Sequence, residues 1–440
     1  MVIANKDWRN KLGKKMNITN RLTWLSYLIF LLLGCAFISQ GVLIICFSKT
    51  YSIDIAHVGY LFFITAAVQA LTTYGNGYLL EKVNIKHEIF IGISAVLLSF
   101  ACIISGWLPL FIIGLFPMGF GYGILISIPN YIILQLHPET KFQKLNFLNF
   151  FFSLGGILGP LLLGQFLDWR YPWQFAVSAC FIFFLLIAFF AGKIPFSRLG
   201  TEDNDETTNE TQPEKKRWHY SIYLIAAAML FYVLSECVFS TWIVSYLKIN
   251  CKFSIAEASM GLTVYWLFIT FGRFAADKIA HYMKVYQFII GSSIIAFTGY
   301  LFLFFTNNTV FTFILIAIMG AGYAALYASL LSYGMDQLPY NSPKLMSILV
   351  LAGTAGTILA LPLSSFFVNH FGLLIALLIG LVFIALVIIS IYLTLKDKDN
   401  RATEHTKRRH WGAISRRTKV FVLRHVWFSL EKVPITYTKD

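Results

Sequence analysis

Long apolar runs alternate with short polar connections along nearly the whole chain. The runs lie at 22–47, 57–80, 89–107, 109–135, 145–167, 174–192, 220–247, 257–277, 286–305, 311–335, 345–368 and 373–395. An apolar run of about 20 residues is long enough to cross the hydrocarbon core of a bilayer as a helix. The pattern therefore predicts an all-α membrane protein with twelve transmembrane helices.

One polar segment interrupts this alternation near the middle of the chain. Residues 193–219 contain six acidic residues followed by three consecutive basic residues, and few large apolar side chains. Such a composition buries too little apolar surface to compensate for the entropy lost on ordering, so we expect a disordered linker. The segment divides the chain into two six-helix halves, 22–192 and 220–395, with an N-terminal tail at 1–21 and a basic C-terminal tail at 396–440.

The two halves also repeat each other in sequence. The motif PMGFGYG at 117–123 returns as IMGAGYA at 318–324, and a glycine-rich run follows each copy, at 153–160 and 352–362. A single run of small residues is explained by close helix packing. Matched runs in the same order favour a duplicated architecture, and parallel repeats of this kind occur in transporters.

Lys and Arg residues are distributed unequally between the two sets of loops. One set holds Lys82, Lys86, Lys141, Lys144, Lys193, Arg198, Lys215, Lys216, Arg217, Lys278, Lys284 and Lys344. The other set holds Lys49, Arg170, Lys248 and Lys252. Because positively charged loops stay on the cytoplasmic side, both termini and the linker are predicted to be cytoplasmic.

Composition and charge narrow the class of protein. Only 13% of residues are charged although the net charge is +14, and the basic residues lie in tails and short loops, so we expect no nucleic-acid partner. The six cysteines are scattered and show neither disulfide nor metal spacing, so we expect no metal and no cofactor. The first apolar run is too long for a signal peptide and is expected to remain as a span.

Twelve spans in two halves with a long central loop resemble the major facilitator superfamily. Its signature between spans two and three is Gly-x-x-x-Asp-Arg-x-Gly-x-Arg-Arg. The loops that resemble this signature contain Gly77, Glu81 and Lys82 in the first half and Arg273 and Asp277 in the second. Asn84 stands where the signature has its second Gly. An acid at a helix end can pair with such bases and stabilise one arrangement of the halves; ordinary flanking charge explains the lysines alone.

A closer resemblance covers most of the chain. The stretches 145–160 and 342–372 look like the TsgA branch of that superfamily, as does the segment leading to Trp242. The resemblance implies a bacterial inner-membrane transporter and does not name its substrate. Because the branch is similar in pattern to proton-coupled sugar carriers, a small polar solute is the expected substrate. The expected partners are this solute and membrane lipids, and the expected oligomeric state is a monomer.

Two ionisable residues, Glu236 and Arg273, lie well inside the predicted spans. Glu236 is within about 4 Å of the middle of its span, and a carboxylate at such depth costs at least ~2.5 kcal/mol. We therefore expect Glu236 to face a cavity or to be protonated, and the resemblance implies that the first span of a half lines the central cavity. Glu236 is the candidate for proton coupling; the alternative is a protonated residue packed in the core. Arg273, close to Asp277, is interpreted as structural.

Polar and aromatic residues inside the spans are the candidates for a substrate cavity. They are Gln40, Asn149, Trp242, Tyr265, Trp266, Tyr323 and Tyr327, extended by Asn130, Tyr131, Asn146 and Thr354. Aromatic rings near the membrane centre can stack on sugar rings, but in a chain with 17% aromatic residues many of them face lipid or other helices. Asn130 and Asn146 lie towards span ends, which also fits a capping role.

Four functional classes fit a protein of this kind. An integral membrane enzyme acting on a lipid-linked substrate is expected to carry acidic residues on large external loops, and these loops are short. A pump subunit needs a phosphate-binding loop, which the chain does not contain. A channel needs a selectivity filter, and nothing resembles one. We therefore interpret the chain as a secondary transporter, with the membrane enzyme as the alternative. The basic, aromatic-rich C-terminal tail fits either a surface helix or a disordered segment.

Overall fold

The computed structural model describes residues 2–79, 84–137, 140–194, 219–280, 282–306, 308–338 and 343–397. Within these ranges the chain folds into helices and short connections. Glu81, Lys82, most of the linker and the C-terminal tail beyond residue 397 lie outside the described residues. The predictions of a disordered linker and of a surface helix therefore remain predictions. The side chains of Gly77 and Asp277 are likewise outside the described part.

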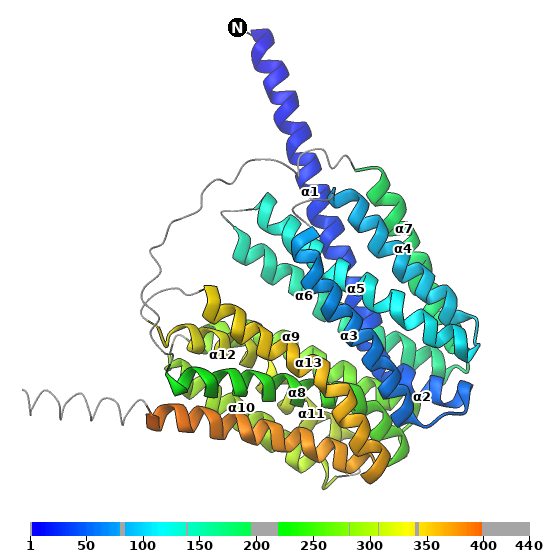
Figure 1. Cartoon of the computed structure of the whole chain (residues 1–440), viewed down its shortest axis with the longest axis vertical. Helices are drawn as coiled ribbons and strands as arrows, with labels where there is room; N and C mark the ends of the chain where they lie inside the picture. Colours follow the sequence, from blue (N-terminus) through cyan, green and yellow to red (C-terminus); the bar gives the residue numbers. More distant parts are fainter. Residues whose placement is uncertain are drawn as a thin grey trace, which may run out of the picture.

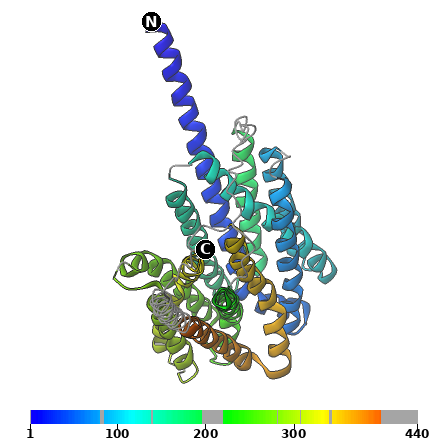
Figure 2. The ribbon, with the colours of Figure 1, turned by 60° about the vertical axis from the view of Figure 1, so that its left-hand side comes forward.

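Helices α1 to α7 form the first half of the chain. Their bounds are Val2–Ile38, Gln40–Tyr51, Ile55–Leu79, Ile85–Ile104, Leu108–Leu136, Lys141–Asp168 and Trp173–Gly192. α1 begins at Val2, so the segment predicted as an N-terminal tail is continuous with the first membrane helix. In Figures 1 and 2 this first part of α1 extends away from the rest of the molecule.

Helices α8 to α13 and one further helix form the second half. α8 to α13 are Tyr220–Ile249, Ile255–Ala280, Val285–Leu303, Thr309–Tyr323, Leu326–Met335 and Pro343–Phe371. The last helix spans Leu373–Asp397. Twelve segments of the described chain are long and apolar enough to cross a membrane. The prediction of an all-α membrane protein with twelve spans is confirmed.

Two of the spans are interrupted, which the apolar pattern does not indicate. Ser39 separates α1 from α2 within the first span, and Ala324 and Ala325 separate α11 from α12 within the tenth. At Ala325 the backbone leaves helical geometry, with φ −119° and ψ 6°. Small and apolar residues continue across the second point, and at the first Ser39 and Gln40 are two polar residues in a run that is apolar on both sides. Neither break therefore ends an apolar run.

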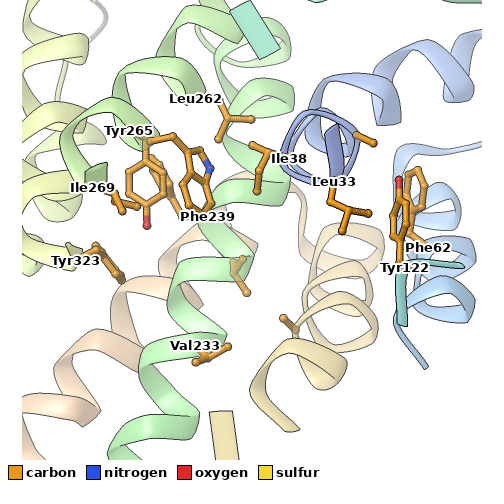
Figure 3. Close-up of a cluster of buried hydrophobic side chains, with 14 of the residues drawn as sticks. Leu33, Ile38, Phe62, Tyr122, Val233, Phe239, Leu262, Tyr265, Ile269 and Tyr323 are labelled. Carbon is orange, nitrogen blue, oxygen red and sulfur yellow. The ribbon is translucent and has the colours of Figure 1, made fainter. Parts of the chain in front are cut away.

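The two halves form separate groups of helices that meet along a limited set of contacts (Figure 1). α6 packs against α9, α3 against α13, and α2 against α8. One buried apolar cluster runs through both halves. In Figure 3, Ile38 lies between Leu33 of its own helix and the side chains of Phe239 and Leu262 from the second half.

The contacts between the halves are tightest at one end of the molecule. We call the end where α7 finishes and α8 starts the linker end, and the opposite end the far end. At the far end, a Cβ on Gly59 of α3 would lie 2.9 Å from the Trp242 ring of α8. Tyr74, about four turns further along α3, is 72% exposed. α3 therefore touches the second half at the far end and is exposed towards the linker end.

Helix α13 of the second half lies opposite α3. Ser365 of α13 is next to Gly59 at the far end. Thr354 and Leu351 follow on the same face of α13, about three and four turns closer to the linker end, and both are exposed. We call the space between these faces of α3 and α13 the opening.

Candidate functional site

Glu236 lies near the middle of α8 and is partly exposed. The Tyr232 side chain, one turn earlier on the same face of the helix, is hydrogen-bonded to the Glu236 carboxyl group. Cys237, beside Glu236, is hydrogen-bonded to Thr357 of α13. Tyr232 therefore holds the Glu236 carboxyl group, while the neighbouring Cys237 faces α13.

Tyrosine side chains surround Glu236 on the other helices of the second half. The Ser235 hydroxyl donates to the Gly380 carbonyl oxygen at 2.5 Å, so its oxygen accepts from the Tyr323 hydroxyl, also at 2.5 Å. The Tyr323 ring lies 5.8 Å from the Tyr232 ring and 5.9 Å from the Tyr265 ring between centroids. Figure 3 shows Tyr265 and Tyr323 on the same side of α8. These rings form a rigid wall behind the carboxyl group.

Most of the predicted aromatic candidates are buried in this wall or at the junction of the halves. Tyr265, Tyr323 and Trp242 are fully buried, and Trp266 is 6% exposed. Trp242 Nε1 donates to Ser364 Oγ at 2.8 Å at the far end, and Trp266 lies against Gly156 of α6. Tyr327, at 37% exposure, is the member of the aromatic set that a solute can reach.

Arg273 of α9 connects three parts of the site. Its Nη1 donates to Ser153 Oγ of α6 at 3.0 Å, and its Nε donates to the Ala324 carbonyl oxygen at 3.3 Å. The guanidinium is also close enough to act electrostatically on Glu236 and Tyr232. Helical side chains point towards the N-terminus of their helix, so the guanidinium reaches deeper than its backbone position indicates. The interpretation of Arg273 as a structural partner of Asp277 missed its contact with Ser153.

The remaining polar candidates of the first half lie in two places. Asn149 is exposed on α6, one turn from Ser153, and its Nδ2 donates to the Leu145 carbonyl oxygen at 3.1 Å. Gln40 lines a cavity of about 510 Å³ whose lining residues all belong to the first half. The structure therefore places Asn149 near Arg273 and Gln40 away from it.

One buried acid was not among the candidates. Glu88, in the first turn of α4, is 4% exposed, and neither of its carboxylate oxygens has a hydrogen-bond partner in the described part of the chain. It lies just before the apolar run predicted at 89–107, so it was not among the ionisable residues inside the predicted spans. Because a buried carboxyl group without partners is costly, Glu88 is a second acid to test for proton binding.

The glycine-rich run of α6 serves helix packing. A Cβ on Gly155 would lie 2.7 Å from the Cys35 backbone nitrogen, and a Cβ on Gly159 would lie 2.6 Å from the Cys35 carbonyl oxygen. These contacts bring α6 directly against the backbone of α1. They explain the glycines without a direct role in solute binding.

The chemical groups exposed at the site are a carboxyl group, a guanidinium, a tyrosine hydroxyl and an amide. Glu236, Arg273, Tyr327 and Asn149 supply these groups. Among the described residues, no group of three or more His, Cys, Asp or Glu side chains is placed to hold a metal ion. The arrangement combines an acid, a base and two neutral hydrogen-bonding groups.

Comparisons with known proteins agree on one family. Residues 25–343 match the Major Facilitator Superfamily. The "Protein TsgA homolog" of Erwinia tasmaniensis is 26% identical over 351 residues, which cover 78% of this chain and 87% of the relative. The "Protein TsgA homolog" of Buchnera aphidicola is 25% identical over 376 residues, covering 84% and 95%.

The fold is similar to that of a solved transporter. A crystal structure of the nucleoside transporter NupG aligns with a TM-score of 0.67 at 13% sequence identity, covering 86% of this chain and 99% of that one. The family match spans well over half of the sequence. The chain therefore belongs to the Major Facilitator Superfamily of multi-pass membrane transporters.

Proposed function

We propose that the chain is a secondary active transporter that moves a small polar solute across the bacterial inner membrane by alternating access, coupled to protons through Glu236. The observation that carries the proposal is the position of Glu236. Its carboxyl group is partly exposed at mid-span and lies within the electrostatic reach of Arg273. Because Arg273 is bonded to the other half at Ser153, a change in the charge of Glu236 can act on the contact between the halves.

The orientation of the chain follows from its loop charges. Twelve Lys and Arg residues of the short loops and linker fall on the linker side and four on the far side. The linker end is therefore assigned to the cytoplasm. In this proposal the opening faces the cytoplasm, the membrane lies across the twelve spans, and both termini are inside.

Alternating access requires that the halves rock about the site. In the present state Glu236 exchanges protons with the cytoplasm through the opening. Closure of α3 against α13 at the linker end and separation at the far end would expose the same group to the other side. Glu236 would then bind a proton on one side and release it on the other while the solute crosses.

The test compares Glu236→Gln with Glu88→Gln in proteoliposomes. The amide of Gln keeps the shape and hydrogen bonding of the carboxyl group but cannot release a proton. Glu236→Gln is expected to retain solute exchange at equal concentrations and to lose accumulation driven by a pH gradient. Glu88→Gln, which removes a buried acid of the first half, is expected to retain both.

Two results would contradict the assignment of the proton to Glu236, and a third would contradict the orientation. Normal gradient-driven accumulation by Glu236→Gln would show that the proton is carried elsewhere. Loss of accumulation in Glu88→Gln alone would assign the proton to Glu88. A reporter fused to the linker and located outside the cytoplasm would reverse the proposed orientation.

A further inference from the structure

Within the described chain, the Arg273 guanidinium donates its hydrogen bonds to neutral acceptors. These are the Ser153 hydroxyl oxygen and the Ala324 carbonyl oxygen. Glu236 is near enough to act on Arg273 electrostatically, but no ion pair of Arg273 is present among the described residues. A guanidinium has further N–H groups in one plane, arranged to bind a carboxylate or phosphate with two parallel bonds.

The position of Arg273 leaves these remaining groups reachable. The side chain is exposed although its partner Ser153 is fully buried. Ala324 lies at the break within span ten, and Tyr327 follows one turn later with an exposed ring. Asn149 is exposed one turn from Ser153 on the opposite half. A ligand that enters from the linker end can therefore meet a cation with a hydroxyl and an amide on its two sides.

A cation inside a membrane protein is stable when it pairs with an opposite charge or is hydrated in a cavity. We infer that the transported solute carries an anionic group, a carboxylate or a phosphate, and that Arg273 binds this group. The inference rests on the proposed transport function and specifies its substrate class. Tyr327 and Asn149 would then bind the polar, uncharged part of the same molecule.

The same geometry links the anion to the proton. The groups that face Glu236 are Tyr232 and Cys237 from α8, Arg273 and Tyr265 from α9, Tyr323 from α11 and Tyr327 from α12. From α13, the Thr357 hydroxyl bonds to the neighbouring Cys237. Arg273 is the single positive charge in this set, so it attracts the Glu236 carboxylate when that group is charged.

An anion bound to Arg273 cancels much of this attraction, so Glu236 takes up a proton more readily when the solute is present. Linkage is reciprocal, so a proton on Glu236 strengthens binding of the anion by the same factor. The anion and the proton would therefore cross together. Each transported proton would balance one negative charge of the solute.

The test measures the melting temperature of the purified full-length protein with matched pairs of solutes. Each pair is an anion and its uncharged counterpart: gluconate and glucose, galacturonate and galactose, and glucose 6-phosphate and glucose, with inorganic phosphate as a further anion. A ligand raises the melting temperature of the state that binds it. At least one anion is expected to stabilise the protein in a saturable manner, while its uncharged counterpart has no effect.

Variants at Arg273 identify the group responsible. Arg273→Gln is expected to weaken anion binding roughly thirtyfold or more, because the bound anion loses its charged, hydrogen-bonded partner. Arg273→Lys keeps the charge and is expected to retain part of the affinity. Ser153→Ala is the matched control, because it removes the hydrogen bond from Arg273 to the other half and leaves the guanidinium in place. It is expected to keep the anion effect.

The outcomes separate this inference from the transport proposal. The inference is overturned if no anion in the panel stabilises the protein, or if a neutral solute stabilises the wild type and Arg273→Gln equally. It is also overturned if Ser153→Ala loses the anion effect as completely as Arg273→Gln. Arg273 would then act through its hydrogen bond to the other half and not by binding the anion. None of these results affects the accumulation test at Glu236. The same binding measurement is repeated as a function of pH. Anion affinity is expected to rise at acidic pH in the wild type and to be independent of pH in Glu236→Gln.

Discussion

Gly59 of α3 and Trp242 of α8 touch across the junction of the two halves. A Cβ on Gly59 would lie 2.9 Å from the Cη2 and Cζ2 atoms of the indole ring. The ring cannot easily move aside, because it is fully buried and its Nε1 is bonded to Ser364 Oγ at 2.8 Å. Closure of the far end therefore depends on the absence of a side chain at position 59.

Gly59→Ala is expected to shift the protein away from the state described here. The added methyl group has to displace Trp242, so the closed far end loses stability and the alternative state gains population. The linker end should then close more often. Labelling of Leu351→Cys on the wall of the opening, in a background without the six native cysteines, should become slower.

Gly75→Ala on the same helix is the control for this experiment. A Cβ at Gly75 meets no atom within 4 Å, and the preference of helices for Ala over Gly applies equally to both positions. Gly75→Ala should leave the labelling rate unchanged. If both variants label Leu351→Cys at the wild-type rate, the contact between Gly59 and Trp242 does not control closure.

The outline of the fold was predictable because it depends on apolar length alone. The twelve spans follow from runs that must match the thickness of a bilayer, and the structure has twelve candidate spans in corresponding places. The breaks at Ser39 and at Ala324 were not predictable in this way. Both lie within apolar stretches, and a change of backbone angle leaves no mark on hydropathy.

The site was predictable in part, and its limits have a physical reason. Glu236 was identified because a carboxyl group in an apolar run is costly and stands out. Gln40 was a candidate for the central cavity, and in the structure it lines a cavity of the first half. A helix that is apolar on every side does not show which face is inward. Ser153 gave no signal, since its role arises only when α6 approaches α9.

The packing of α1 against α6 predicts a clear effect on stability. A Cβ on Gly155 would overlap the Leu31 carbonyl oxygen, and a Cβ on Gly34 would overlap the Phe152 carbonyl oxygen, so the two backbones are in reciprocal contact. Gly155→Ala forces the helices apart and is expected to destabilise the protein by roughly 1–3 kcal/mol. Thermal unfolding in one detergent measures the change.

Gly291→Ala in α10 is the matched control for Gly155→Ala. A Cβ at Gly291 meets nothing within 4 Å, so only helix propensity changes, which favours Ala by up to about 1 kcal/mol. The control should unfold at the same temperature as the wild type or slightly higher. Equal melting temperatures for the two variants would show that α1 can move away from α6 at little cost.

His137 gives the last prediction, which concerns pH. The residue follows α5 at the linker end, and its Nε2 lies 2.8 Å from Thr23 Oγ1 of α1. The Thr23 hydroxyl donates to the Thr19 carbonyl oxygen at 2.9 Å, so its oxygen is free to accept from the His137 ring. Burial, and next the nearby Lys144, lower the pKa of His137 below its ordinary value.

A lowered pKa means that the folded protein binds a proton at His137 less readily than the unfolded chain does. The resulting stability is fully present above the ordinary pKa of histidine and is lost as the pH falls from that value through the lower, folded-state pKa. The melting temperature of the wild type should therefore decrease over this acidic range. His137→Gln keeps a donor for Thr23 without a titrating group, so its melting temperature should depend less on pH there. Thr23→Val removes the hydrogen bond but leaves the histidine and Lys144, and should keep most of the wild-type slope. If His137→Gln retains the full slope, the acid sensitivity arises from another group.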